Sequence, residues 1–155
     1  IEAIKLFCKN KNYKAIWLWP NIDAGSDTFS KKIRMFKDSN PNFVRFIKNF
    51  TPEDYAKVMK NSKCVVGNSS SGIREASFLG VPSVNIGTRQ SDRERGPNVR
   101  DVEYNKNKIL KSISQQVGKK FKKSFIYGSG DAGKKIGKIL SKTNFTINKK
   151  LNYLK

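Results

Sequence analysis

The stretch from Cys64 to Ala76 has the residue types and spacing of an anion-binding turn. A short apolar run ends at Gly67, the small polar residues Asn-Ser-Ser-Ser-Gly follow at 68–72, and Glu75 comes three residues later. This order is typical of a buried strand, a turn and the first turn of a helix. A phosphate can bind there because the first N–H groups of a helix lack partners and carry the positive end of its dipole. Glu75 would then accept hydrogen bonds from sugar hydroxyls beside that phosphate.

The same stretch also fits an ordinary capped turn without a ligand, in which Ser71 is the helix N-cap and Glu75 assists the capping. It matches neither the Walker A loop nor the G-x-G-x-x-G motif of dinucleotide sites. Taken alone, the stretch favours this structural interpretation, so support for a ligand site must come from other parts of the chain.

The composition limits the chemistry that the chain can carry. Its 155 residues include no histidine, which excludes Ser-His-Asp and Cys-His nucleophile systems and most zinc sites. The two cysteines, Cys8 and Cys64, lie in apolar patterns and are predicted to be buried, reduced thiols of a cytoplasmic protein. No apolar run approaches the roughly 18 residues of a membrane span. We expect no metal, no cofactor and no membrane partner.

The net charge of +20 is concentrated towards the end of the sequence. Residues 106–155 contain 14 lysines, no arginine and a single acid, Asp131. Such a segment can attract nucleic acid, but base recognition relies on arginine, whose fork matches base edges. Moreover, the apolar residues Ile109, Leu110 and Ile113 define one face of a helix and leave the lysines on the other. The segment is therefore interpreted as a solvated face and not as a specific nucleic-acid site.

Short apolar runs alternate with amphipathic segments along the chain, as in α/β proteins with a parallel sheet. Strands are predicted at 14–19, 43–47, 63–66, 83–86 and 99–102. Helices are predicted at 2–10, 27–38, from 52, at 72–79, at 105–117 and from 132, with Thr51 and Asp131 as N-caps and Gly80 as a terminator. Together they predict one Rossmann-like, doubly wound domain over residues 1–155. Residues 125–130 are predicted to form a loop with buried aromatic side chains.

The polar loops that follow the first four predicted strands would meet at one edge of such a sheet. They are residues 21–26, 49–51, 68–72 and 87–98. Doubly wound sheets bind ligands at this edge, outside the carboxyl ends of the strands. This convergence raises the ligand-binding interpretation of residues 68–72 above the purely structural one.

Three ordered motifs resemble UDP-N-acetylglucosamine 2-epimerases. They are Pro-Asn-Ile-Asp-Ala-Gly-Ser at 20–26, Gly-Asn-Ser-Ser-Ser-Gly-Ile-Arg-Glu at 67–75 and Gly-Val-Pro-Ser-Val-Asn-Ile-Gly-Thr-Arg-Gln at 80–90. The later Tyr-Gly-Ser-Gly-Asp-Ala at 127–132 looks like that family's Tyr-Gly-x-Gly-x-Ala segment. The resemblance covers about residues 14–141 and is closest to the hydrolysing branch, which starts the sialic acid and related nonulosonate pathways.

The fold that this resemblance implies has two domains, of the glycosyltransferase-B type, with the active site between two Rossmann-like halves. The chain looks like the C-terminal half of such a protein. Its first residue is Ile1, already within an amphipathic pattern, which fits a piece of a longer protein. The resemblance therefore implies a separate N-terminal domain as a partner, and a homo-oligomer in the full-length enzyme.

Individual residues receive roles from the same resemblance. The candidate UDP-binding residues are Asn21, Phe50, Ser69, Ser70, Gly72, Glu75 and Arg89. The serines and the glycine match positions that contact the diphosphate, and Glu75 matches the acceptor of the ribose hydroxyls. The region of Phe50 matches the loop that holds uracil. Asn21 and Arg89 match further ligand contacts.

Two of these residues also have structural interpretations. Arg89 could form a surface ion pair with Asp92 or Glu94, and Asn21 could serve only to form a turn after a proline. As ligand contacts, Arg89 would stabilise a leaving diphosphate, and Glu75 could accept two hydroxyls at once in charge-assisted bonds.

The sequence departs from the family pattern in its acid/base groups. The resemblance places the catalytic carboxylates and a histidine mostly in the N-terminal half, and we identify no catalytic residue in this chain. The implied function is the UDP-binding half of a hydrolysing epimerase, which forms N-acetylmannosamine and UDP from UDP-N-acetylglucosamine. A non-catalytic nucleotide-sugar-binding module and half of a glycosyltransferase are alternatives, and a nucleic-acid-binding domain is a weaker one. The sugar stays open between N-acetylglucosamine and a 2,4-diacetamido relative.

Overall fold

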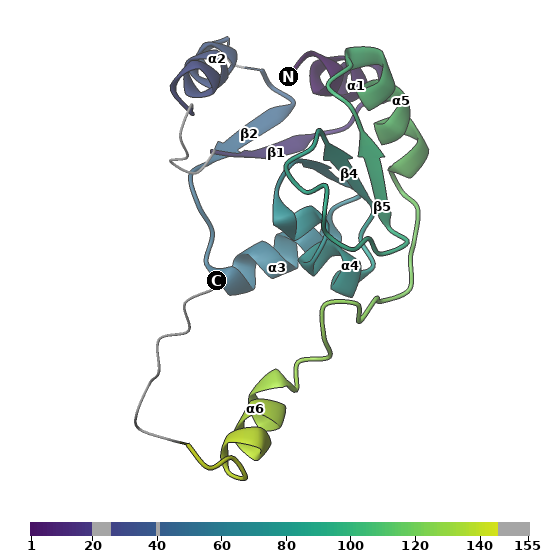
Figure 1. Cartoon of the computed structure of the whole chain (residues 1–155). Coiled ribbons are helices and arrows are strands. Elements are labelled where there is room, and N and C mark those ends of the chain that lie inside the picture. The colour runs from purple at the N-terminus through teal and green to yellow at the C-terminus, as the bar shows by residue number, and fades with distance from the viewer. Residues whose placement is uncertain (20–25, 40, 146–155) are drawn as a thin grey trace, which may run out of the picture.

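The computed structural model describes residues 1–19, 26–39 and 41–145, with the backbone alone for 26–29. The strands are β1 (Ala15–Leu18), β2 (Val44–Ile47), β3 (Val65–Gly67), β4 (Ser83–Ile86) and β5 (Val99–Val102). The α-helices are α1 (Glu2–Lys11), α2 (Ser26–Asp38), α3 (Pro52–Asn61), α4 (Glu75–Leu79), α5 (Lys106–Gln116) and α6 (Ala132–Leu140), and η1 (Ser70–Gly72) is a 3-10 helix (Figure 1). Every strand predicted from the sequence forms, within two residues at either end.

All strand pairings in the described residues are parallel. β1 pairs with β2 in one sheet, and β4 lies between β3 and β5 in a second sheet. In the second sheet Val66 lies opposite Val84, which in turn lies opposite Arg100. The predicted α/β class with parallel strands is confirmed. The sequence predicts a single sheet, but the described strands form two. The three-residue β3 pairs with β4 and makes no ladder with β1 in the described residues.

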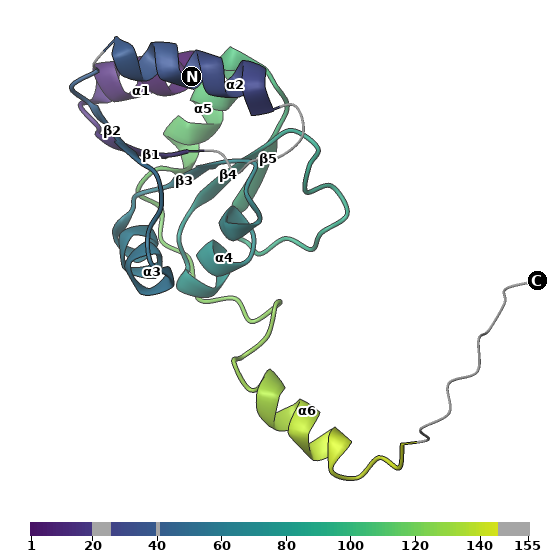
Figure 2. The ribbon, with the colours of Figure 1, turned by 90° about the vertical axis from the view of Figure 1, so that its left-hand side faces the viewer.

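Helices cover both faces of the β3–β4–β5 sheet (Figure 2). On one face α1 and α5 pack together and α5 contacts β4 and β5, while α3 and α4 pack together on the other. The buried centre of the first core consists of Phe7, Val84 and Ile113, and that of the second consists of Met59, Ala76 and Val81. β3 contributes Val66 to the first core and Val65 to the second, because successive side chains of a strand point to opposite faces. This two-sided burial is the predicted doubly wound arrangement.

Helix α2 packs on the smaller sheet, β1–β2, through aromatic contacts. Phe36 is 4% exposed and meets Trp17 of β1 and Phe46 of β2 edge-on, each with ring centroids 5.6 Å apart. Edge-to-face pairs of this kind add to the free energy gained from burying the rings.

The segment after β3 differs from the continuous helix predicted at 72–79. It forms the 3-10 turn η1, and the α-helix α4 begins only at Glu75. At Gly72 the turn lies directly on β4, because a Cβ built there would come within 2.6 Å of Ser83 Oγ. Gly80 ends α4 as predicted, in the left-handed conformation with a φ of 70°.

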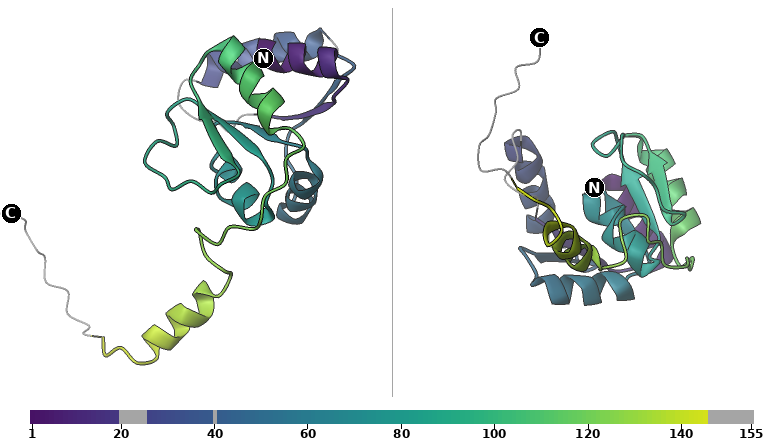
Figure 3. Two further views of the ribbon diagram at one scale, coloured as in Figure 1. Left: turned by 90° about the vertical axis from the view of Figure 1, so that its right-hand side faces the viewer. Right: turned by 60° about the horizontal axis from the view of Figure 1, so that its bottom comes forward.

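The region after α5 is less buried than the sequence predicts. Phe125, Ile126 and Tyr127 are 56%, 39% and 38% exposed, so the prediction of buried aromatic side chains there is wrong. α6 begins after Asp131 as predicted, but this carboxylate accepts a hydrogen bond from Ser129 Oγ (2.7 Å) and pairs with Lys135 instead of capping the backbone. Figure 3 shows that α6 lies apart from both sheets, and none of its residues is buried.

The apolar side chains of α6 are exposed for the same reason. Ile136, Ile139 and Leu140 are each more than half exposed. None of the described helices combines the length and apolar character needed to cross a membrane.

The prediction of a solvated lysine face holds for α5. Ile113 is buried and Ile109 packs against the same core, whereas Lys106, Lys108 and Lys111 are exposed. These lysines lie outside the core, and Lys108 pairs with Glu103 just after β5. The exposed side of the helix is therefore polar, as solubility requires of a surface helix.

A buried asparagine joins β5 to the end of α4. Asn98 is 1% exposed; its Oδ1 accepts from Ser77 Oγ (2.6 Å) and its Nδ2 donates to the carbonyl of Val81 (2.7 Å). We expect Asn98→Ala to lower the free energy of unfolding by about 2–4 kcal/mol, because two buried polar groups lose their partners. Urea unfolding would measure the change, with exposed Asn107→Ala as the control. A loss below about 0.5 kcal/mol would contradict the role of this network.

Candidate functional site

The turn after β3 is held by side-chain hydrogen bonds. Ser69 is the cap of η1, and its Oγ accepts from the N–H of Ser71 (3.4 Å). The Oγ of Ser71 lies 3.0 Å from Ser69 Oγ and 2.7 Å from the hydroxyl of Tyr55 in α3. The interpretation of Ser71 as the N-cap is therefore wrong, because its buried hydroxyl is turned towards α3. Ser69 is exposed and Ser70 half-buried, so both can meet a ligand, whereas Gly72 is buried against β4.

Glu75 is the first residue of α4 and is exposed. The interpretation that it assists capping is wrong, because α4 has Arg74 at its N-cap position and no side-chain cap bond. Within the described part of the chain, no hydrogen bond or ion pair involves the Glu75 carboxylate. A carboxylate in this state can accept hydrogen bonds from two hydroxyl groups of a ligand.

Phe50 lies immediately before α3. Thr51 caps this helix as predicted, because its Oγ1 accepts from the N–H of Asp54 (3.2 Å). The Phe50 ring is half-buried and stacks on Tyr55 with centroids 6.5 Å apart and an angle of 25°. The same tyrosine thus contacts the ring of Phe50 and the hydroxyl of Ser71.

Arg89 lies in the loop that joins β4 to β5, and its side chain is exposed. The next residue, Gln90, is 4% exposed and donates from Nε2 to the carbonyl oxygen of Asn68 (2.9 Å). This bond connects the loop after β4 directly to the turn after β3. Gln90 Oε1 is buried without a hydrogen-bond partner in the described part of the molecule. Asn21, the remaining candidate, lies outside the described residues.

An arginine holds the base of this loop. Arg95 Nε pairs with Asp101 of β5 (3.0 Å to Oδ2), and Arg95 Nη2 donates to the carbonyl of Gln90 (2.6 Å). Arg95 also donates to the carbonyl of Arg93. Asp101 in turn accepts from Asn85 Nδ2 of β4 (2.6 Å). We call these bonds of Arg95 the clamp. It was not predicted from the sequence, although Arg95 and Asp101 lie on either side of the start of the predicted strand at 99–102, which is a signal for such an ion pair.

Tyr127 brings a fourth segment to the same loops. Its hydroxyl donates to the carbonyl of Glu94 (2.6 Å), and its ring lies 5.8 Å from the guanidinium carbon of Arg74. The segment at 127–132, noted for its motif, therefore borders both the loop after β4 and the start of α4. Contacts join the turn after β3, the loop after β4, the start of α3 and Tyr127.

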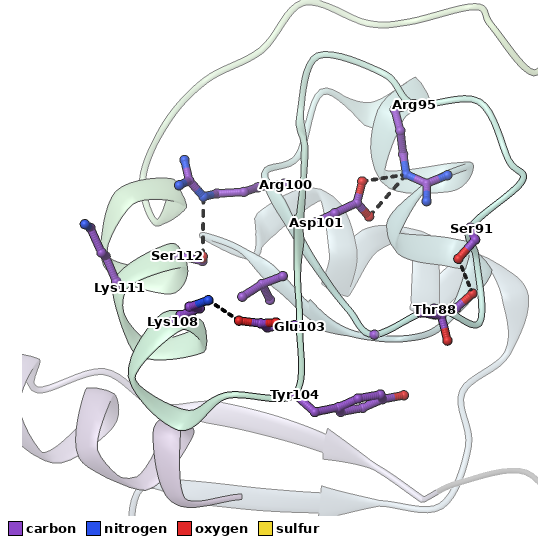
Figure 4. Close-up of a pocket in the computed structure, with 12 residues that line it drawn as sticks. Thr88, Ser91, Arg95, Arg100, Asp101, Glu103, Tyr104, Lys108, Lys111 and Ser112 are labelled. Atoms are coloured by element: carbon purple, nitrogen blue, oxygen red, sulfur yellow. Dashed lines mark hydrogen bonds and ion pairs between the residues drawn. The ribbon is translucent and has the colours of Figure 1, made fainter.

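An open depression of about 780 Å³ lies beside this loop, between β5 and α5 (Figure 4). None of the described candidate UDP-binding residues lines it. Two of its four basic side chains form ion pairs, Arg95 with Asp101 and Lys108 with Glu103. Arg100 donates to the neutral Ser112 Oγ, and Lys111 also lines the depression. We assign this depression no part in nucleotide binding, because none of the described candidate residues reaches it.

The described residues offer few groups for acid/base or nucleophilic chemistry. Burial raises the pKa of the Cys64 thiol to about 12 and also raises that of Cys8, so neither thiol supplies a thiolate at neutral pH. Both cysteines are free. No group of three or more Cys, Asp or Glu side chains in the described ranges could hold a metal ion.

Comparison with known proteins identifies the family. A sequence profile described as UDP-N-acetylglucosamine 2-epimerase matches residues 1–141. The chain belongs to this family. Relatives include "Polysialic acid biosynthesis protein P7" of Escherichia coli, 36% identical over 121 residues, 78% of this chain and 30% of that protein. A UDP-N,N'-diacetylbacillosamine 2-epimerase (hydrolyzing) of Legionella pneumophila is 36% identical over 130 residues, 83% of this chain and 34% of that protein. The chain thus spans about a third of the length of these relatives.

A solved structure supports the fold. The UDP-GlcNAc 2-epimerase of Methanocaldococcus jannaschii, crystallised in complex with UDP-GlcNAc and UDP, superposes with a TM-score of 0.69 at 20% identity. The match covers 90% of this chain and 39% of that one. The chain therefore folds as one Rossmann-like part of an epimerase.

The clamp can be tested on the loop that it holds. Arg95→Met keeps the aliphatic stem and removes the bonds to Asp101 and to the loop carbonyls. We expect faster hydrogen–deuterium exchange in residues 88–95 and a loss of about 1–2 kcal/mol of unfolding free energy. Arg93→Met, an exposed position in the same loop, is the matched control. Unchanged exchange in the Arg95 variant would show that other contacts hold the loop.

Proposed function

We propose that this chain binds the UDP moiety of UDP-N-acetylglucosamine as the nucleotide-binding domain, residues 1–155, of a hydrolysing 2-epimerase. The observation that carries the proposal is the set of contacts that joins three elements. The ring of Phe50 stacks on Tyr55, Tyr55 bonds to the turn that presents Ser69, and Gln90 bonds to the same turn beside Arg89. An aromatic ring, hydroxyl donors and a cation are the groups that a uridine diphosphate requires.

Each element would contact a different part of the nucleotide. Ser69 and Ser70 would donate to the diphosphate from their hydroxyls, and Gly72 keeps the turn close to the sheet. The N–H of Ser70, at the start of η1, would be a further donor, because those of Ser71, Gly72 and Ile73 donate within the turn. Glu75 would accept the ribose hydroxyls, and Phe50 would border the uracil. Arg89 would stabilise the charge on the departing diphosphate, with Asn21 as a further contact.

The proposed reaction begins with removal of UDP from the sugar and continues by hydration of an unsaturated intermediate to N-acetylmannosamine. The described residues would bind UDP, whereas the acid/base groups would belong to an N-terminal domain. The relatives' names support a 2-acetamido sugar and leave open whether position 4 carries a second acetamido group. We propose a cytoplasmic homo-oligomer that supplies sialic or nonulosonic acid synthesis.

Glu75 provides a direct test. We expect Glu75→Ala to weaken UDP binding by about 1.5–3 kcal/mol, the range for hydrogen bonds to a charged group, or roughly 10- to 150-fold in Kd. Titration calorimetry would measure it, with Glu53→Ala, an exposed acid in the first turn of α3, as the matched control. Wild-type affinity in the Glu75 variant would remove this residue from the proposed site.

The charge of the chain provides a test against nucleic-acid binding. We expect a random DNA duplex to bind weakly at physiological salt and without sequence preference, with affinity rising steeply at low salt because binding would come from counterion release. A fluorescence anisotropy titration at several salt concentrations, beside a UDP titration, would measure both. Tight binding at physiological salt with preference for one sequence would favour a nucleic-acid function instead.

A further inference from the structure

We propose that Tyr55 is a positioning residue that turns the hydroxyl of Ser69 towards the diphosphate. This inference rests on the proposed function, because it concerns how the same UDP site is held. It starts from three atoms in a row, with the Tyr55 hydroxyl 2.7 Å from Ser71 Oγ and Ser71 Oγ 3.0 Å from Ser69 Oγ. Ser69 is the exposed end of this row.

The direction of the hydrogen bonds follows from counting protons and lone pairs. A hydroxyl has one proton and two lone pairs, and diphosphate oxygens only accept, so Ser69 must give its proton to the ligand. The bond between the two serines must then run from Ser71 to Ser69, whose Oγ also accepts from the N–H of Ser71. Ser71 has then used its proton and must accept from Tyr55. One arrangement of the protons therefore satisfies every group.

The phenol is suited to start this row because its ring is fixed. Tyr55 packs on the core of Met59, Ala76 and Val81, and its ring also stacks on Phe50. The side chain is half-buried, so a ligand would meet its neighbours first. Tyr55 thereby sets the positions of the aromatic ring and the hydroxyl that are proposed to hold the two ends of UDP.

The two contacts can be separated by substitution. Tyr55→Phe keeps the ring against Phe50 and removes the proton donor, whereas Tyr55→Ala removes both. We expect Tyr55→Phe to weaken UDP binding about tenfold and to change uridine binding less than twofold, because uridine lacks the diphosphate. Tyr55→Ala should weaken both ligands.

The experiment is an NMR titration of the 155-residue chain with UDP and with uridine. Ser71→Ala should reproduce the loss of UDP affinity, and the double variant Tyr55→Phe/Ser71→Ala should bind UDP no more weakly than either single variant, because all three interrupt one row. Tyr13→Phe is the matched control, since that tyrosine packs on Phe7 in the other core. Thermal unfolding of each variant would confirm that the fold is retained.

The outcomes separate this inference from the proposed function. Unchanged UDP affinity in both Tyr55→Phe and Ser71→Ala, equal losses for UDP and uridine, or additive losses in the double variant would overturn the positioning role alone. Failure of the unsubstituted chain to bind UDP would overturn the proposed function and the positioning role together. If Tyr55→Phe does not fold, Ser71→Ala decides the question by the same comparison of the two ligands.

Discussion

The close approach of Gly72 to β4 is the constraint on which the arrangement of the site depends. A side chain at this position would meet Ser83 Oγ at 2.6 Å, and Ser83 is itself 1% exposed and donates from its N–H to the carbonyl of Asn98. The turn therefore lies directly against the sheet, and a side chain at position 72 would push the two apart. In this position the Ser71 hydroxyl bonds to Tyr55 of α3, and the carbonyl of Asn68 accepts from Gln90 in the loop after β4.

The site is built from exposed groups on buried supports. Ser69, Glu75 and Arg89 are exposed, whereas Ser71 and Gln90 are buried and hold the loops that carry the exposed groups. Ser71 and Gln90 act through hydrogen bonds between uncharged groups. Because both side chains are shielded from water, these bonds are retained and an unpaired polar group there would be costly. The buried, uncharged residues thus fix the backbone from which the ligand-facing side chains extend. No buried charge is placed beside an anionic ligand.

The sequence predicted what depends on local chemistry. Thr51 before a proline, the glycine at 80 and the apolar runs of β4 and β5 gave caps and strands that the structure confirms. It could not predict contacts between segments. The ring of Tyr55 packs on the core as an apolar helix face does, but helical periodicity does not report where the hydroxyl points. The aromatic residues at 125–127 were expected to be buried because such side chains usually are, yet this segment makes only surface contacts. The Tyr127 hydroxyl bonds to the carbonyl of Glu94, and Phe125 meets the partly exposed Phe78 edge-on.

Neither the spacing of residues 68–75 nor the net charge of the chain identifies the ligand. A net charge of +20 raises the local concentration of any anion, but fields between exposed charges fall off over about 8 Å at physiological salt. The lysines of α6 lie on a helix that stands apart from the sheets, so the medium screens them from the turn after β3 (Figure 1). Selectivity for one nucleotide must therefore come from short-range contacts. Those available are the hydroxyls of the turn, the carboxylate of Glu75 and the ring of Phe50, which lie in η1, at the start of α4 and before α3.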